Sequence, residues 1–138
     1  MTTDSATPLS TKLGITEGST LVLLSAPDAL VLDLPPDVEV RRQARGRADV
    51  VVAFLTERAW LEQRVARLGA MVFPAGGLWV AWPKRASGVP TDVTDGAVRR
   101  VALPLGLVDN KVCAVDATWT GLRLVWRRDL RAAGTCPR

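Results

Sequence analysis

The residue types that most often carry enzymatic chemistry are scarce in this chain of 138 residues, which contains no histidine and no tyrosine. Histidine is the commonest general base and metal ligand, and it completes most Ser-His and Cys-His nucleophile pairs. Any catalysis would therefore depend on carboxylates, hydroxyl groups, the three lysines or a cofactor. The sequence predicts no catalytic residue and no metal site.

Two short segments are the best candidates for a binding pocket. One is Ser25, Ala26 and Pro27, which follow an apolar run, and the other is Trp82, Pro83 and Lys84, which end another. In a doubly wound sheet, ligands bind at the carboxyl ends of the strands. There Trp82 would form a flat wall and Lys84 would face an anion. The alternative is that Trp82 packs in the core and Lys84 is only solvated.

Three further residues are assigned to this pocket, namely Thr91, Asp92 and Trp119. Thr91 and Asp92 precede an expected helix, so capping that helix is their alternative role. Trp119 lies near an expected hairpin turn on the crevice side of the sheet. The two cysteines, Cys113 and Cys136, are interpreted as small hydrophobic residues rather than as a disulfide or a metal site.

Arginine supplies most of the positive charge, and the formal net charge is +4. The candidate anion-binding residues are Arg42, Arg45 and Arg85, because guanidinium groups bind phosphate in a bidentate manner. No P-loop pattern accompanies them. Acidic residues are spread along the same chain, and the basic residues are not interleaved with aromatic ones. This pattern favours a solvated basic face over a nucleic-acid site.

Apolar periodicity divides the chain into expected strands and helices. Strands are predicted at 20–25, 38–41, 49–55 and within 76–84, and helices at 8–14, 29–34 and 57–69, the last capped by Thr56. A further helix begins at Thr91 or Thr94 and is closed by Pro104 and Gly106. A hairpin pairs 111–116 with 122–127 through a turn at 118–121.

This order of elements predicts an α/β fold, a reduced doubly wound, mostly parallel Rossmann-like sheet with a C-terminal antiparallel hairpin. The strands that start at Thr20, Asp49 and Gly77 should be parallel neighbours, with 122–127 antiparallel to them. The chain is too short for a full set of βα units, so one must be missing or shortened within 25–48. The predicted organisation is a flexible tail at 1–7, one α/β domain at 8–128 and a flexible tail at 129–138.

The apolar runs also limit where the protein can act. None approaches the roughly 20 residues that a membrane span requires. The first residues are polar and lack the apolar stretch of a signal peptide. We therefore expect a cytoplasmic protein without a membrane segment.

Part of the chain resembles the middle of class I methyltransferases. An Asp-initiated strand from Asp49 and a helix are followed by Pro74-Ala75-Gly76-Gly77, which leads into the next strand. The resemblance implies that fold's last βα unit and antiparallel strand at the end of the chain. More closely, residues 8–128 resemble a small actinobacterial family of unknown function. The strings that carry this resemblance are Leu13-Gly14, Ser25-Ala26-Pro27, Gly77-Leu78-Trp79-Val80-Ala81-Trp82-Pro83-Lys84, Ser87-Gly88-Val89-Pro90-Thr91-Asp92 and Leu105-Gly106-Leu107-Val108-Asp109-Asn110-Lys111-Val112-Cys113.

The chain departs from the methyltransferase pattern where that fold binds S-adenosylmethionine. A methyltransferase has an acidic, glycine-rich loop after its first strand, whereas this loop contains Ser25-Ala26-Pro27 and no glycine. The second strand of a methyltransferase usually ends in an acid that accepts the ribose hydroxyls. Here Arg41-Arg42, which can only donate, takes that place. We therefore expect a degenerate site and no cofactor.

The function predicted from the sequence is that of a non-catalytic binding or regulatory domain, which acts through a protein partner or a small anionic ligand. The alternatives are a divergent S-adenosylmethionine-dependent methyltransferase and a nucleic-acid-associated basic protein. Five tryptophans in a short chain also favour self-association, because exposed aromatic area is typical of interfaces. Single exposed aromatic residues occur without any partner, which is the alternative.

Overall fold

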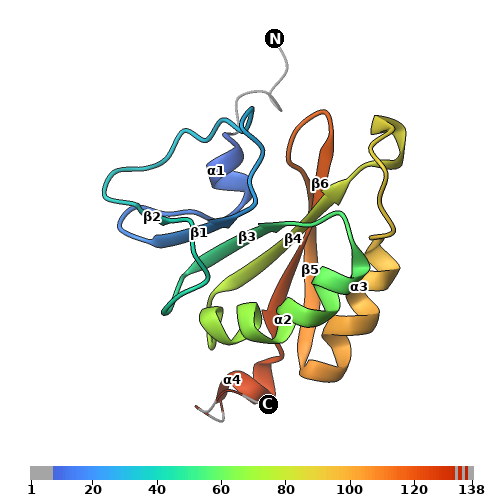
Figure 1. Cartoon of the computed structure of the whole chain (residues 1–138). Helices are drawn as coiled ribbons and strands as arrows, with labels where there is room; N and C mark the ends of the chain where they lie inside the picture. The colour runs from blue at the N-terminus through green and yellow to red at the C-terminus, as the bar shows by residue number, and fades with distance from the viewer. Residues whose placement is uncertain (1–7, 133, 135, 137–138) are drawn as a thin grey trace.

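The computed structural model describes residues 8–132, 134 and 136, so the tail predicted at 1–7 lies outside the described residues. A six-stranded sheet has the order β2-β1-β3-β4-β6-β5 (Figure 1). Its strands are β1 (Thr20–Leu24), β2 (Glu39–Arg41), β3 (Val50–Phe54), β4 (Gly77–Pro83), β5 (Leu107–Ala114) and β6 (Trp119–Trp126). The first four strands are parallel, whereas β6 is antiparallel to both β4 and β5. The predicted sheet is confirmed.

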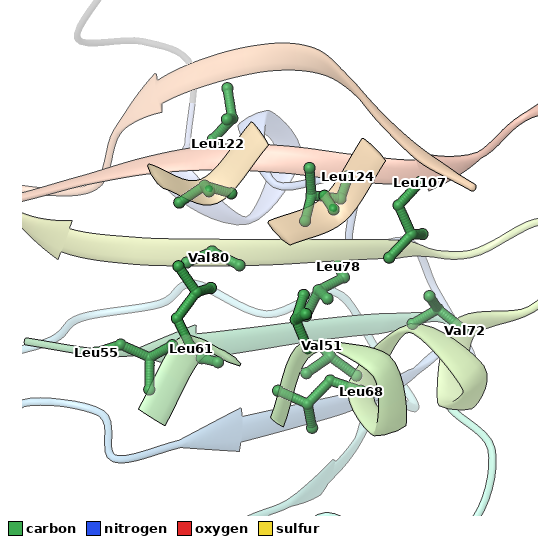
Figure 2. Close-up of a cluster of buried hydrophobic side chains, with 14 of the residues drawn as sticks. Val51, Leu55, Leu61, Leu68, Val72, Leu78, Val80, Leu107, Leu122 and Leu124 are labelled. Atoms are coloured by element: carbon green, nitrogen blue, oxygen red, sulfur yellow. The ribbon is translucent and has the colours of Figure 1, made fainter. Parts of the chain in front are cut away.

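Two helices cover one face of the sheet, α2 (Arg58–Val72) and α3 (Asp95–Ala102). Figure 2 shows Leu61 and Leu68 of α2 pointing toward Val51 and Leu78 of the sheet. The continuous apolar runs of β3 and β4 follow from this arrangement, because both strands are buried on both faces. The connection from β4 to β5 contains α3 and two 3₁₀ turns, η2 (Arg85–Ser87) and η3 (Leu103–Leu105).

The opposite face carries a second core under α1 (Leu9–Lys12) and the loop between β1 and β2. Leu9 and Leu13 both pack in this core, which confirms that they share a buried side. The buried indole Nε1 of Trp79 donates a hydrogen bond to the carbonyl of Leu13 at 2.9 Å. This bond attaches the N-terminal segment to the centre of the sheet.

Among the described residues, no helix is both long and apolar enough to cross a bilayer.

The segment 25–48 lacks a helix in either connection, as the length of the chain predicted. The helix predicted at 29–34 is wrong, because that stretch is a turn followed by extended chain that arches away from the sheet (Figure 1). Leu30 and Leu32 both pack against the second core. Residues two apart, such as Leu30 and Leu32, lie on the same side of an extended chain but not of a helix. The short helix predicted here would also be marginally stable on its own.

The hairpin turn lies at 115–118 rather than at the predicted 118–121. Asp116 Oδ1 accepts hydrogen bonds from the backbone N–H groups of Thr118 and Trp119, both at 2.8 Å, and so turns the chain earlier. Gly121, which had indicated a turn, instead lies within β6 beneath the ring of Trp79. A Cβ at Gly121 would stand 3.2 Å from that ring. This glycine serves close packing.

Helix α2 and the C-terminal segment also differ from the prediction. Helix α2 continues past Gly69 to Val72, because Gly69 makes room for Leu107 and Trp126 instead of ending the helix. The C-terminal tail predicted without regular structure contains α4 (Arg128–Ala132). Its Leu130 packs against the core between the sheet and the helices α2 and α3, here called the first core. This contact explains why so short a segment is helical.

Candidate functional site

The residues predicted to form one pocket do not share one cavity: seven of them are divided among three cavities, and Lys84 and Asp92 line none of the three. Ser25 follows β1, Pro83 ends β4, and Trp119 begins β6 directly opposite Pro83. Strand β3 lies between β1 and β4, so the two predicted segments are not adjacent. The topology therefore brings them to the same edge without joining them.

The first cavity, here called the β1–β2 cavity, has a volume of about 550 Å³. Its lining residues are Leu23, Ala26, Pro27, Asp28, Leu30, Leu32, Leu34, Val40 and Arg42. It unites two predicted pocket residues, Ala26 and Pro27, with one predicted anion-binding residue, Arg42. Sequence reasoning missed the leucines of the loop. Their spacing at 30, 32 and 34 could have identified them, because alternate residues of an extended chain share one side.

The backbone that leads from β1 into the loop of this cavity has an unusual conformation. Ser25 adopts a positive φ of 57°, in the left-handed region that glycine enters most easily. Pro27, two residues later, has no N–H group to offer a ligand. Its carbonyl accepts a hydrogen bond from the backbone of Leu30 at 3.1 Å, which closes a turn.

The second cavity, here called the tryptophan cavity, has a volume of about 390 Å³ and contains two of the predicted pocket residues, Ser25 and Trp119. Its remaining lining residues are Phe54, Leu55, Thr56, Glu57, Trp60 and Arg64. Trp119 packs edge-to-face on Phe54 at 5.2 Å. The guanidinium of Arg64 lies 3.8 Å from the ring centroid of Trp60, so the exposed face of this tryptophan already has a cation on it.

The third cavity, of about 400 Å³, contains Trp82, Pro83, Arg85 and Thr91. Trp82 is only 9% exposed and packs in the first core, as its alternative interpretation proposed. The ammonium of Lys84 is not directed at this cavity's interior. Its Nζ donates to the carbonyl of Asp116 at 2.8 Å and so braces the hairpin turn.

Thr91 and Asp92 connect the loop before α3 to the start of α2. The Thr91 hydroxyl donates to the carbonyl of Thr56 at 2.7 Å, and Asp92 Oδ1 accepts from the backbone N–H of Arg58 at 2.7 Å. Asp92 therefore caps α2 rather than the helix that follows it. The cap predicted at Thr56 is wrong, and α3 is capped by Thr94, whose Oγ1 accepts from Ala97 at 3.1 Å.

The three candidate anion-binding arginines do not converge. Arg42 lines the β1–β2 cavity, Arg85 lines the third cavity, and Arg45 lines a separate surface depression with Arg67. No group of three or more acidic, cysteine or histidine side chains that could hold a metal occurs in the described part of the chain. Cys113 is buried in the second core, and this burial raises the pKa of its thiol.

The fold is similar to solved structures of methyltransferases. Magnesium protoporphyrin IX methyltransferase from Synechocystis PCC 6803, solved with bound SAH, superposes with a TM-score of 0.59 and 9% identity, over 90% of this chain and 81% of that chain. A SAM-dependent methyltransferase from Aquifex aeolicus gives a TM-score of 0.51 and 12% identity, over 83% and 85%. No protein-family model and no curated protein matches the chain. At these identities the likeness concerns the fold alone, which resembles the Rossmann-like fold of methyltransferases.

Proposed function

We propose that this protein is a non-catalytic binding domain whose β1–β2 cavity holds a small amphipathic anion. The observation that carries the proposal is the composition of that cavity: among its described lining residues, Arg42 is the one cation and most of the others are of apolar type. Ligand sites are typically concave, about 300–1,000 Å³ in volume and mostly apolar, with a few polar groups that orient the ligand. The β1–β2 cavity, at about 550 Å³, falls within this range.

The charges in the cavity support an anionic ligand. Within the described residues, Arg42 takes part in none of the four ion pairs and makes no side-chain hydrogen bond, so its five donors remain available. A guanidinium group binds a carboxylate, sulfonate or phosphate in a bidentate manner. Asp28 lines the same cavity without pairing with Arg42, and it can accept a hydrogen bond from a hydroxyl or amine of the ligand.

The same cavity does not fit S-adenosylmethionine, the cofactor that the fold implies. The loop after β1 presents the side chains of Ala26 and Pro27 where a methyltransferase presents bare glycine backbone, and Pro27 has no N–H group. At the end of β2, Arg42 offers only donors to ribose hydroxyls that need an acceptor. We therefore propose that the protein does not use this cofactor, and we assign no methyl-transfer step.

A fluorescence titration with 1-anilinonaphthalene-8-sulfonate tests the site, because this probe is itself an apolar anion. The test variant is Arg42→Met, which keeps the length of the side chain and removes its charge. The control is Arg100→Met, which changes the net charge equally at an exposed arginine outside the cavity. We expect Arg42→Met to weaken binding by at least about fivefold, given the strength of a charge-assisted hydrogen bond, and Arg100→Met to bind like the parent protein. Equal weakening in both variants, or in neither, would refute the assignment.

Calorimetry with S-adenosylmethionine tests the cofactor part of the proposal. We expect no saturable binding tighter than about 100 μM, which corresponds to roughly −5.5 kcal/mol. Tighter binding would overturn the non-catalytic assignment and favour a divergent methyltransferase. Independently of this titration, native mass spectrometry of protein purified without added ligand shows whether an anion of the expected class co-purifies.

A further inference from the structure

Arg123 of β6 has an unusual position for a charged side chain. Its guanidinium lies against the backbone of Gly77, where a Cβ would stand 2.5 Å from Nε and 2.8 Å from Nη2. A side chain at position 77 would displace the guanidinium from this place, so glycine is what allows Arg123 to lie against the backbone here. The neighbours of Arg123 across the sheet are Trp79 on β4 and Lys111 on β5. Gly77, which begins the strand, therefore has a packing role that concerns a charged group.

In the described part of the chain, the Arg123 guanidinium has no acidic partner. It belongs to none of the four ion pairs and to no side-chain hydrogen bond of the described residues. Its partial burial lowers the pKa of the guanidinium, and no carboxylate opposes that shift. The nearby ammonium of Lys111 is a like charge, and it donates to the carbonyl of Lys12 at 3.2 Å. A half-buried cation without a counter-ion is unfavourable unless something outside the chain supplies the negative charge.

Arg123 opens into a cavity of about 400 Å³ at the amino ends of β1, β3 and β4, the edge of the sheet opposite the β1–β2 cavity. We call it the amino-end cavity. The lining residues that bear on its chemistry are Thr20, Arg47, Asp49 and Phe73. A second guanidinium, that of Arg47, reaches the same space. Its Nη2 donates to the carbonyl of Phe73 at 3.1 Å, which holds the group in place while its other donors remain available.

One acid also lines this cavity. Asp49 is held at the wall formed by β1 and β3, because its Oδ2 accepts the backbone N–H of Thr20 at 2.8 Å. Asp49 forms no ion pair with Arg47 or with Arg123. Among the described residues, the cavity therefore carries two guanidinium groups outside any ion pair and one carboxylate, whose Oδ2 accepts a backbone N–H. The two positive charges outnumber the one negative charge, which favours an anion.

We propose that the amino-end cavity is an oxyanion-binding site, in which Arg123 and Arg47 hold a phosphate or carboxylate group of a small molecule. This site is independent of the β1–β2 cavity and does not depend on the function proposed for it. Two guanidinium groups on different elements can each donate a pair of hydrogen bonds to such a group. A bound anion would supply the counter-charge that Arg123 lacks within the fold.

Calorimetric titration with inorganic phosphate, and separately with acetate, at constant ionic strength tests the proposal. Binding of phosphate alone would identify a phosphate site, binding of acetate alone a carboxylate site, and binding of both a general oxyanion site. We expect Arg123→Met to weaken the binding by at least about tenfold, because a charge-assisted bidentate contact is lost. Arg47→Met should act in the same direction, and Arg100→Met, which lowers the net charge equally outside the cavity, should not.

Arg123→Met should fold, since it replaces a half-buried unpaired charge with an apolar side chain of similar length. If it does not, Arg123→Lys keeps the charge but loses the planar fork, and should still weaken binding by about threefold or more. The proposal is overturned if the unaltered protein shows no saturable binding of either anion up to about 10 mM. That concentration is well above the dissociation constant of roughly 1 mM expected for weak specific binding. The proposal is also overturned if the Arg123 variant binds as tightly as the Arg100 variant.

Discussion

Replacing Asp92 by alanine should destabilise the fold through a helix that begins 34 residues earlier in the chain. Helix α2 has Glu57 at its N-cap position, but the Glu57 side chain makes no capping hydrogen bond. Asp92 Oδ1 instead accepts the first helical N–H, that of Arg58, at 2.7 Å. Asp92→Ala removes this acceptor and leaves an N-terminal N–H group without a protein partner.

The expected cost combines two effects. Loss of a capping side chain typically costs about 1 kcal/mol. The carboxylate also interacts favourably with the positive end of the helix dipole, which adds about 0.5 kcal/mol at an exposed site such as this one. We therefore expect Asp92→Ala to lower the free energy of unfolding by about 1.5 kcal/mol, or roughly 5 °C in Tm for a domain of this size. Asp92→Asn keeps an oxygen acceptor and should lose only about 0.5 kcal/mol.

Urea denaturation followed by circular dichroism measures these differences, and the chain provides a matched control at Thr56. Thr56 is the cap that local sequence favours, but within the described residues its hydroxyl makes no hydrogen bond, while its carbonyl accepts one from Thr91. Thr56→Ala should therefore change stability by less than about 0.5 kcal/mol. If Thr56→Ala proves as damaging as Asp92→Ala, or if Asp92→Ala has no effect, the capping contact across the fold is refuted.

Two further predictions concern an ion pair and a buried indole. The hydrogen bond from Arg99 lowers the pKa of Asp109 below its ordinary value of 3.8, so the pair stabilises the fold above that pH and less so as acid protonates the carboxyl. Urea titrations at about pH 6 and about pH 2.5 should therefore show that Asp109→Asn is destabilising at the higher pH and nearly neutral at the lower one, and a constant difference would contradict this. Trp79→Phe leaves the buried carbonyl of Leu13 without its donor and opens a small void, at a cost of about 3 kcal/mol. Trp60→Phe, at a site 41% exposed, is the control and should cost less than about 0.5 kcal/mol, so comparable losses in the two variants would count against the argument.

Much of the fold could be predicted from the sequence because it depends on local patterns. The unbroken apolar runs that became β3 and β4 require burial on both faces, and parallel central strands provide it. The helical spacing of Leu61, Val65 and Leu68 identified α2. Chain length alone indicated a missing unit between Ser25 and Ala48, and the structure has no helix there.

The candidate site was only partly predictable, because its members come together through the topology of the sheet. Ala26, Pro27 and Arg42 were each singled out in the sequence, but only the parallel pairing of β1 with β2 places them in one cavity. The same topology separates Trp82 from Ser25 by inserting β3 between their strands. Strand order is not encoded in any local pattern, so the sequence could not decide which candidates would meet.

The amino-acid sequence by itself determined the central strands, the helix α2, the segment in which a βα unit is missing, and which catalytic residue types are unavailable. Those properties follow from periodicity, chain length and composition, which act within a few residues of each position. The tertiary structure decided that Asp92 caps a distant helix, that Gly121 packs under Trp79, and that the guanidinium of Arg123 lies against Gly77. Each of these depends on strand register and on the crossing of elements far apart in the chain, and only the packed fold fixes those distances.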